Sequence, residues 1–184
     1  MERISIGDLP AEPYDENLHT DRRELTEPLS LEGVSMVQYT LEPGERFSGA
    51  AHAHPDQEEV FVVLEGEATF EVGRAADDDG PQRVTIEENE ALRFAPGEFQ
   101  TGWNDGDDRL VALALGAPRE TGDVLIDRIP VLDAAVACPD CGRDTMRIVS
   151  AGDDADTDAD DQDRDGDEDG GLECPDCGSR TSVE

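Results

Sequence analysis

The chain has 184 residues, and its 47 Asp and Glu residues outnumber 14 Arg residues, while Lys is absent, so that the formal net charge is −33. A surface of that sign repels phosphate backbones and anionic lipids, which argues against a nucleic-acid or membrane partner. Because the sequence has neither an apolar run long enough to cross a bilayer nor the pattern of a secretory signal, it predicts a cytoplasmic protein.

The first part of the chain changes character near residue 34. Residues 1–33 are polar and interrupted by Pro, and they predict an N-terminal arm that docks on a neighbouring sheet or subunit. In residues 34–116, short runs rich in Val, Phe, Leu and Thr alternate with turn residues, which predicts an all-β sandwich or barrel. The eight predicted strands lie within residues 34–41, 46–54, 59–66, 67–73, 82–87, 91–95, 100–104 and 109–116.

The last third of the chain holds three further segments. Residues 117–137 predict a linker with one apolar stretch that packs back on the barrel. Residues 138–184 contain all four cysteines and form a second, small unit. An acidic tract at residues 151–171 interrupts this unit, and its lack of apolar side chains predicts disorder.

Two histidines in the barrel region form the first candidate site. His52 and His54 are two residues apart, so on a strand both imidazoles leave the same face. If the chain turns after Pro55 and returns as the next strand of a hairpin, Glu59 comes beside them. Two imidazoles and one carboxylate form a facial triad that suits Fe(II), Mn or a similar divalent ion. The alternative is that both histidines simply face solvent.

The residues around this pair resemble the cupin superfamily. His52, His54, Glu59 and Gly66 match its first motif, and the segment from Pro96 to Asn104 matches much of its second motif. The resemblance implies a double-stranded β-helix, or jelly-roll barrel, with the site inside. It also implies a divalent metal (Fe, Mn, Ni or Zn), a small-molecule ligand or substrate, and a homodimer.

The second motif departs from the family pattern at one ligand position. Gln100 stands where the family usually has a third His, and its amide oxygen remains a neutral hard ligand that favours harder ions. Some cupins bind no metal, so this change also favours a pocket without catalysis. Asn104 and Arg93 are further pocket candidates, the latter for an anionic substrate, although an exposed arginine is the alternative.

The four cysteines form two near-identical knuckles. Cys138 with Cys141, and Cys174 with Cys177, each stand in a Cys-Pro-Asp-Cys-Gly segment. Two such pairs predict a closed zinc site of four thiolates that is structural, since no position is left for substrate. Redox-active pairs or disulfides are the alternatives. The unit resembles zinc ribbons, which implies a possible protein partner.

The composition adds one more resemblance. Asp-rich runs without any Lys are similar to proteins of salt-loving archaea, where concentrated salt screens the charge. Together these observations leave two functions open. The first is a cupin whose barrel metal site binds or transforms a small molecule. The second is a noncatalytic ligand-binding or regulatory module whose zinc ribbon contacts another protein.

Overall fold

The structure is a computed structural model that describes residues 1–132, 134–149 and 171–182. Its elements are strands apart from two single-turn helices, η1 (Ile6–Asp8) and η2 (Pro130–Leu132). Within the described ranges, therefore, no helix has the length and apolarity to cross a membrane. The all-β prediction is confirmed.

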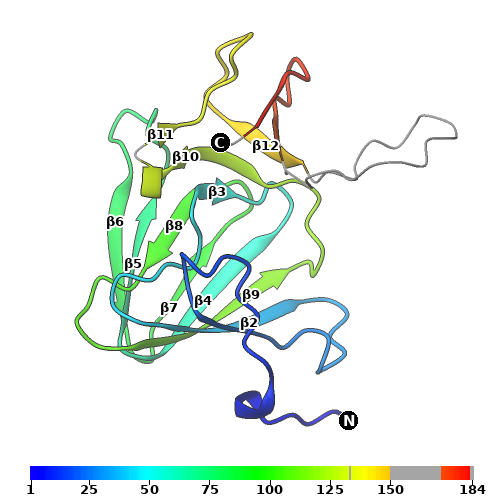
Figure 1. The fold of residues 1–184 in the computed structure, drawn as a ribbon, viewed down its shortest axis with the longest axis vertical. Helices are drawn as coiled ribbons and strands as arrows, with labels where there is room; N and C mark the ends of the chain where they lie inside the picture. Colours follow the sequence, from blue (N-terminus) through cyan, green and yellow to red (C-terminus); the bar gives the residue numbers. More distant parts are fainter. Residues whose placement is uncertain (133, 150–170, 183–184) are drawn as a thin grey trace, which may run out of the picture.

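Five antiparallel strands form the first sheet, and they bring distant parts of the chain together (Figure 1). The N-terminal arm supplies its edge strand β1, which pairs with β2 of the same chain. Long β4 and β9 form its centre. In order across the sheet, the strands are β1 (Asp21–Glu24), β2 (Ser35–Leu41), β9 (Leu110–Ala117), β4 (Glu58–Glu65) and β7 (Ala91–Phe94).

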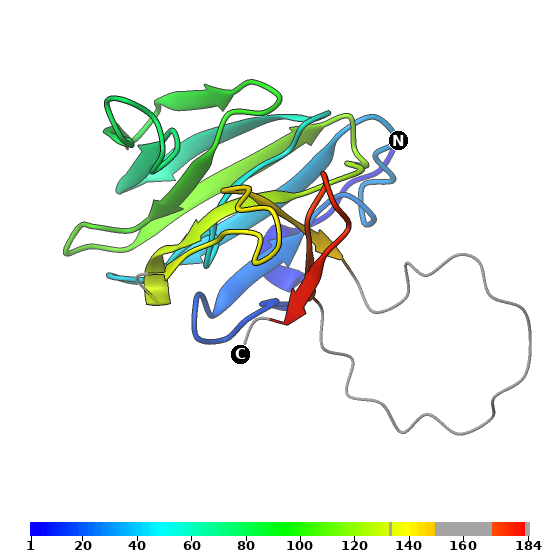
Figure 2. The ribbon, with the colours of Figure 1, turned by 90° about the horizontal axis from the view of Figure 1, so that it is seen from above.

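The second sheet faces the first and extends beyond it. Its barrel strands are β6 (Gln82–Glu87), β5 (Glu67–Val72), β8 (Gln100–Trp103) and β3 (Ala51–Ala53). Beyond β3 the same sheet continues through β10 (Leu125–Ile129), β12 (Met146–Val149), β13 (Gly171–Glu173) and β14 (Arg180–Ser182), and β11 (Ala134–Ala135) pairs with β10. Viewed from above, β12 in gold lies beside β10, and the β13–β14 hairpin in red follows on the other side of β12 (Figure 2). All eight strands expected between residues 34 and 116 are present, as β2 to β9.

An aromatic core fills the space between the two sheets. Alternate residues of β2 are buried, as expected for a strand with one face against a core. Phe61 and Phe94 of the first sheet meet Phe70 of the second, and Phe47 joins them from the segment before β3, with ring centroids 5.0–6.0 Å apart. Phe47 and Phe61 of this core also line a cavity near β3 and β10.

Two segments outside the barrel strands differ from their simple sequence description. Residues 117–137, expected to be a linker, contain β10, which is hydrogen-bonded to both β3 and β12. The predicted disorder of residues 151–171 concerns residues outside the described part of the chain, except Gly171, which belongs to β13. Strand β3 of the barrel and strand β12 of the cysteine unit are therefore joined through β10 within one sheet.

Candidate functional site

The first residue of the site, His52, lies at the centre of the second sheet. It is the register partner of Gln100 on β8 and of Ile126 on β10, so these three side chains share one face. Its Nδ1 lies 3.1 Å from the carbonyl oxygen of Ala50. In the tautomer that donates this hydrogen bond, Nε2 keeps its lone pair free for a metal ion inside the barrel.

Glu59 reaches the histidines by a different route from the one expected. The predicted hairpin is wrong, because β3 pairs with β8 and β10, whereas β4 belongs to the opposite sheet. Both edges of β3 are already occupied, so the turn after His54 crosses between the sheets instead of reversing within one. Glu59 therefore faces His52 and His54 across the barrel interior, which is how a carboxylate and two imidazoles can surround one point.

The geometry of the three groups suits a shared cation. One ligand atom from each of His52, His54 and Glu59 lies within 4.8 Å of the others, and His54 Nε2 is 3.6 Å from Glu59 Oε1. Burial lowers the pKa of His54, although the Glu59 carboxylate opposes this shift. Loss of water thus favours the neutral imidazole, which is the form that binds metals.

Gln100 gives an independent test of whether a metal fits. Its amide nitrogen lies 3.2 Å from His52 Nε2 and donates to Glu59 Oε2 at 3.0 Å. Its amide oxygen is buried and has no hydrogen-bond partner. A half-turn of the amide would place this oxygen between the same two groups, where a cation would satisfy it. The donor set therefore fits a divalent ion held by two imidazoles, one carboxylate and one amide.

The other predicted barrel residues lie away from this group. Arg93 is exposed and donates to the Glu58 carboxylate at 2.6 Å. Glu58 therefore forms an ion pair on the outer surface, whereas its neighbour Glu59 points into the barrel. Asn104 is buried, but its amide donates to the carbonyl oxygens of Leu41 and Asp108 and its oxygen accepts from Gly106 N–H. It holds the turn after β8, and it does not line the cavity.

A cavity of about 630 Å³ opens above the His and Glu group. This volume is in the range of small-molecule sites. Sequence reasoning missed that Tyr14 and Leu18 of the N-terminal arm and Ile148 and Leu172 of the cysteine unit all line it. In the sequence these are isolated apolar residues within polar segments, which indicates that they are buried against another part of the chain. Their spacing does not show which surface they cover.

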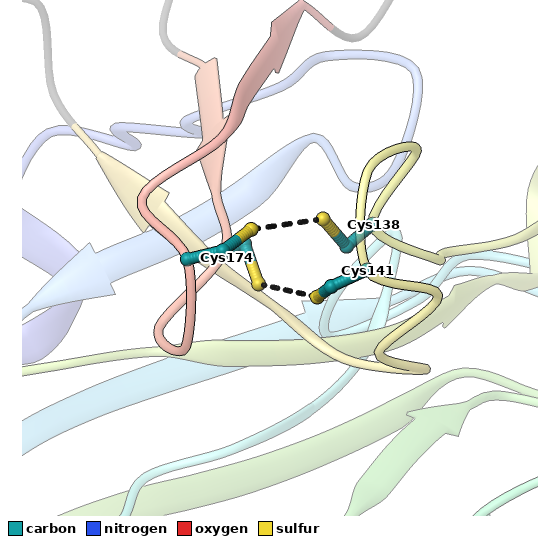
Figure 3. Close-up of side chains that lie close together, drawn as sticks. Cys138, Cys141 and Cys174 are labelled. Atoms are coloured by element: carbon teal, nitrogen blue, oxygen red, sulfur yellow. Dashed lines mark hydrogen bonds between the residues drawn. The ribbon is translucent and has the colours of Figure 1, made fainter.

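The four cysteines converge from two loops. Figure 3 shows Cys138 and Cys141 on one loop opposite Cys174 on the other. The Sγ atoms of Cys138 and Cys177, and those of Cys141 and Cys174, are 3.5 Å apart, and all four lie within 4.8 Å of one another. Tetrahedral zinc with bonds of about 2.3 Å requires sulfur separations of about 3.8 Å. The cluster therefore has the dimensions of a four-thiolate site.

The cysteine ionisation also favours a cation. The backbone N–H of Cys141 donates to the Cys138 sulfur and lowers the pKa of that thiol to about 6. The N–H of Ser179 acts in the same direction on Cys177, but the Cys138 sulfur and burial outweigh it and raise the pKa of Cys177 to about 12. One thiolate thus forms easily and opposes the next, a conflict that a bound cation removes.

Residues 37–116 match the profile of a family described as "Cupin domain". This segment is the part of the chain that supplies β3 to β9 and most of β2. It also holds all four proposed barrel ligands. Residues 37–116, less than half of the chain, are thus similar to a cupin domain. No curated protein is a significant match to the sequence.

Solved structures support the cupin fold. A protein with a double-stranded β-helix domain from Klebsiella pneumoniae has a TM-score of 0.51 and 20% identity, over 66% of this chain and 94% of its own. The oxalate decarboxylase of Lactobacillus farciminis has a TM-score of 0.51 and 16% identity, over 63% of this chain and 33% of its own. At these identities the likeness shows the fold alone.

Proposed function

We propose that the cupin domain binds a divalent metal ion through His52, His54, Glu59 and Gln100, and that it binds or transforms a small molecule in the cavity beside this ion. The observation that carries the proposal is the convergence of two imidazoles and a carboxylate from opposite sheets. The unpartnered, buried oxygen of Gln100 supports it independently.

The chain's own residues would then divide the work. When bound, the metal would act as a Lewis acid that orients an oxygen-bearing ligand. The Gln100 amide donates to the Glu59 carboxylate in this structure, and its half-turn would bring the amide oxygen to the ion instead. His52 is held in one tautomer by the Ala50 carbonyl. Such outer contacts pre-set the direction of the donor atoms. The surrounding apolar walls exclude water from the coordinated group.

Elemental analysis of the full chain tests the metal claim. After loading with Mn²⁺ or Fe²⁺, the wild-type protein should hold one ion in addition to any zinc, and the His52→Ala/His54→Ala variant should lose that ion while keeping the zinc. His19→Gln is the matched control, because His19 is the remaining histidine and its ring is not part of the group. Zinc at one ion per chain with no second metal would refute the barrel site.

A noncatalytic binding module is the second candidate. The observation that favours it is Gln100, because three strong protein ligands hold a late transition metal less firmly than a set with a third imidazole. Under this alternative, Gln100→His should raise the affinity for the metal, while neither the wild type nor the variant converts a ligand of the cavity into a product. Under the first proposal, the same change should alter the turnover of the metal-loaded protein.

We further propose that the four cysteines hold a structural zinc ion, on the sulfur separations given above. Cys138→Ser should lower the zinc content, whereas Ser179→Ala, which keeps the backbone N–H beside Cys177, should not. The homodimer and a protein partner for the cysteine unit stay predictions, which sedimentation of the full chain and of its Cys138→Ser variant can test.

A further inference from the structure

The cysteine unit shares one sheet with the metal-binding part of the barrel. β10 pairs with β3, which carries His52, on one side and with β12 of the cysteine unit on the other. His52 lies opposite Ile126, and Ile126 lies opposite Met146. Because register partners point to the same face of a sheet, the face that carries His52 continues into the cysteine unit.

A shared core holds the two parts together. Met146 and Leu172 of the cysteine unit pack in one buried cluster with Ile126 of β10, and the cluster also contains Cys138 and Cys174. Met146 is fully buried, and Leu172 is 5% exposed. Burying such side chains contributes about 1.5–3 kcal/mol each. The unit is therefore fixed against the barrel.

The cysteine unit also supplies part of the cavity wall. The Ile148 N–H donates a hydrogen bond to the Val124 carbonyl. On the other side of β12, Ile148 is the register partner of Leu172 on β13. All three of these residues line the cavity above the His and Glu group. Ile148 is nevertheless 45% exposed, so an apolar surface faces the open part of the cavity.

The cavity lining is apolar and carries no cationic side chain. Apart from the His52, His54, Glu59 and Gln100 group, its polar side chains are Tyr14, Tyr39 and Ser48 among the described residues. None of the lining residues in the described part of the chain is Arg, although Arg is the only basic residue type besides His in the sequence. Away from the proposed metal ion, a phosphate or carboxylate on the ligand would thus meet no partner charge on these walls.

We propose that the cysteine unit is part of the ligand site, in which Ile148 and Leu172 complete an apolar wall that selects a ligand with an uncharged, apolar body and a polar end at the His and Glu group. The inference deepens the proposed function and takes from it the cavity as the ligand site. It assigns the far wall of that cavity to residues outside the cupin domain match.

A matched pair of fluorescent probes tests the ligand class. N-phenyl-1-naphthylamine is neutral, and 8-anilinonaphthalene-1-sulfonate has the same aromatic body with one sulfonate. In a buffer with enough salt to screen the net charge, the full chain without a barrel metal ion should bind the neutral probe at least about tenfold more tightly. Equal affinity for the two probes, or tighter binding of the sulfonate, would overturn the assignment of an uncharged ligand body.

Substitution of the wall tests the role of the cysteine unit. Ile148→Asp should weaken binding of the neutral probe at least about tenfold, because a carboxylate would face the apolar body. The control is Leu132→Asp, which changes a comparably exposed residue, 58% exposed, that does not line the cavity. Equal affinity of the two variants would overturn the proposal. Should Ile148→Asp lose its circular dichroism spectrum, Ile148→Ser takes its place with the same two outcomes.

Metal content separates this inference from the proposed function. The His52→Ala/His54→Ala variant should lose the barrel ion, and Ile148→Asp added to that variant should still weaken binding of the neutral probe, because the contribution of the apolar wall does not depend on the ion. If no barrel ion is found but Ile148→Asp weakens the probe, only the metal proposal fails. If the barrel ion is present and Ile148→Asp has no effect, only the cavity-wall inference fails.

Discussion

Gly102 offers a direct test of the packing beneath the site. An added Cβ at this position would lie 2.5 Å from Phe70 Cε1 and 2.9 Å from Phe47 Cδ2. Both rings are buried and stack 5.5 Å apart, so neither can turn into free space. Gly102→Ala should therefore destabilise the fold by about 1–3 kcal/mol, which is the usual cost of overpacking a core. For a chain of this length, 1 kcal/mol corresponds to a Tm shift of about 2–4 °C.

The assay is urea unfolding of the full chain, followed by fluorescence of its one Trp residue. Gly33→Ala is the control, because no atom lies within 4 Å of the added Cβ and its φ is ordinary. Its free energy of unfolding should change by less than about 0.5 kcal/mol. Phe70→Leu should relieve part of the Gly102→Ala penalty in the double variant. Equal stability of Gly102→Ala and wild type would refute the close packing of these rings.

Three further predictions concern the site and its surroundings. Gln100→Met should weaken Mn²⁺ binding about 10–100-fold in calorimetric titration, while the metal-free stability changes by less than about 1 kcal/mol because the lost hydrogen bonds are offset by removal of an unpaired buried oxygen. Burial lowers the pKa of His19, although the hydrogen bond to the Arg46 carbonyl opposes this shift. As the pH drops below about 6.5, the unfolded chain therefore binds a proton more readily than the folded chain, and the free energy of unfolding decreases. His19→Gln should reduce this slope in urea unfolding by up to about 1.4 kcal/mol per pH unit; an unchanged slope would contradict the assignment. Asp127→Ala should cost about 1–3 kcal/mol in the same assay, because it removes the buried carboxylate that accepts from the Ala75 N–H and pairs with Arg128, although Arg128 keeps its second partner Glu71. Loss of the exposed Glu65 ion pair should cost less than about 1 kcal/mol.

The sequence was sufficient for the strands and for the residues that converge. Alternating apolar residues predicted the eight strands from β2 to β9, because each has one face against the core. His52 and His54 share a face by spacing alone, and the motif spacing selected Glu59 rather than Glu58. The first choice depends on local periodicity, which the sequence carries directly, and the second depends on the resemblance to the cupin motif.

Long-range pairing could not be predicted in the same way. A turn after His54 suggested a hairpin, but the edges of β3 are taken by β8 and by β10, which lies more than 70 residues away in sequence. Nothing local marks Ile126 as the partner of His52, or Ile148 as a cavity residue. The Asn104 amide donates to the carbonyl oxygens of Leu41 and Asp108 and is therefore not free for a ligand. The spacing of residues in the sequence does not reveal where these carbonyl groups lie.

The unbroken pairing from β3 through β10 to β12 has a thermodynamic consequence. One buried cluster and one continuous sheet join the residues before and after position 137. The barrel and the cysteine unit should therefore unfold together in one transition. We expect a chelator that removes zinc from the four thiolates to lower the Tm of one unfolding transition of the whole chain. A truncation after residue 137 should expose Ile126 together with a free strand edge on β10. The cysteines would thus influence the stability of the histidine-bearing strand without touching it.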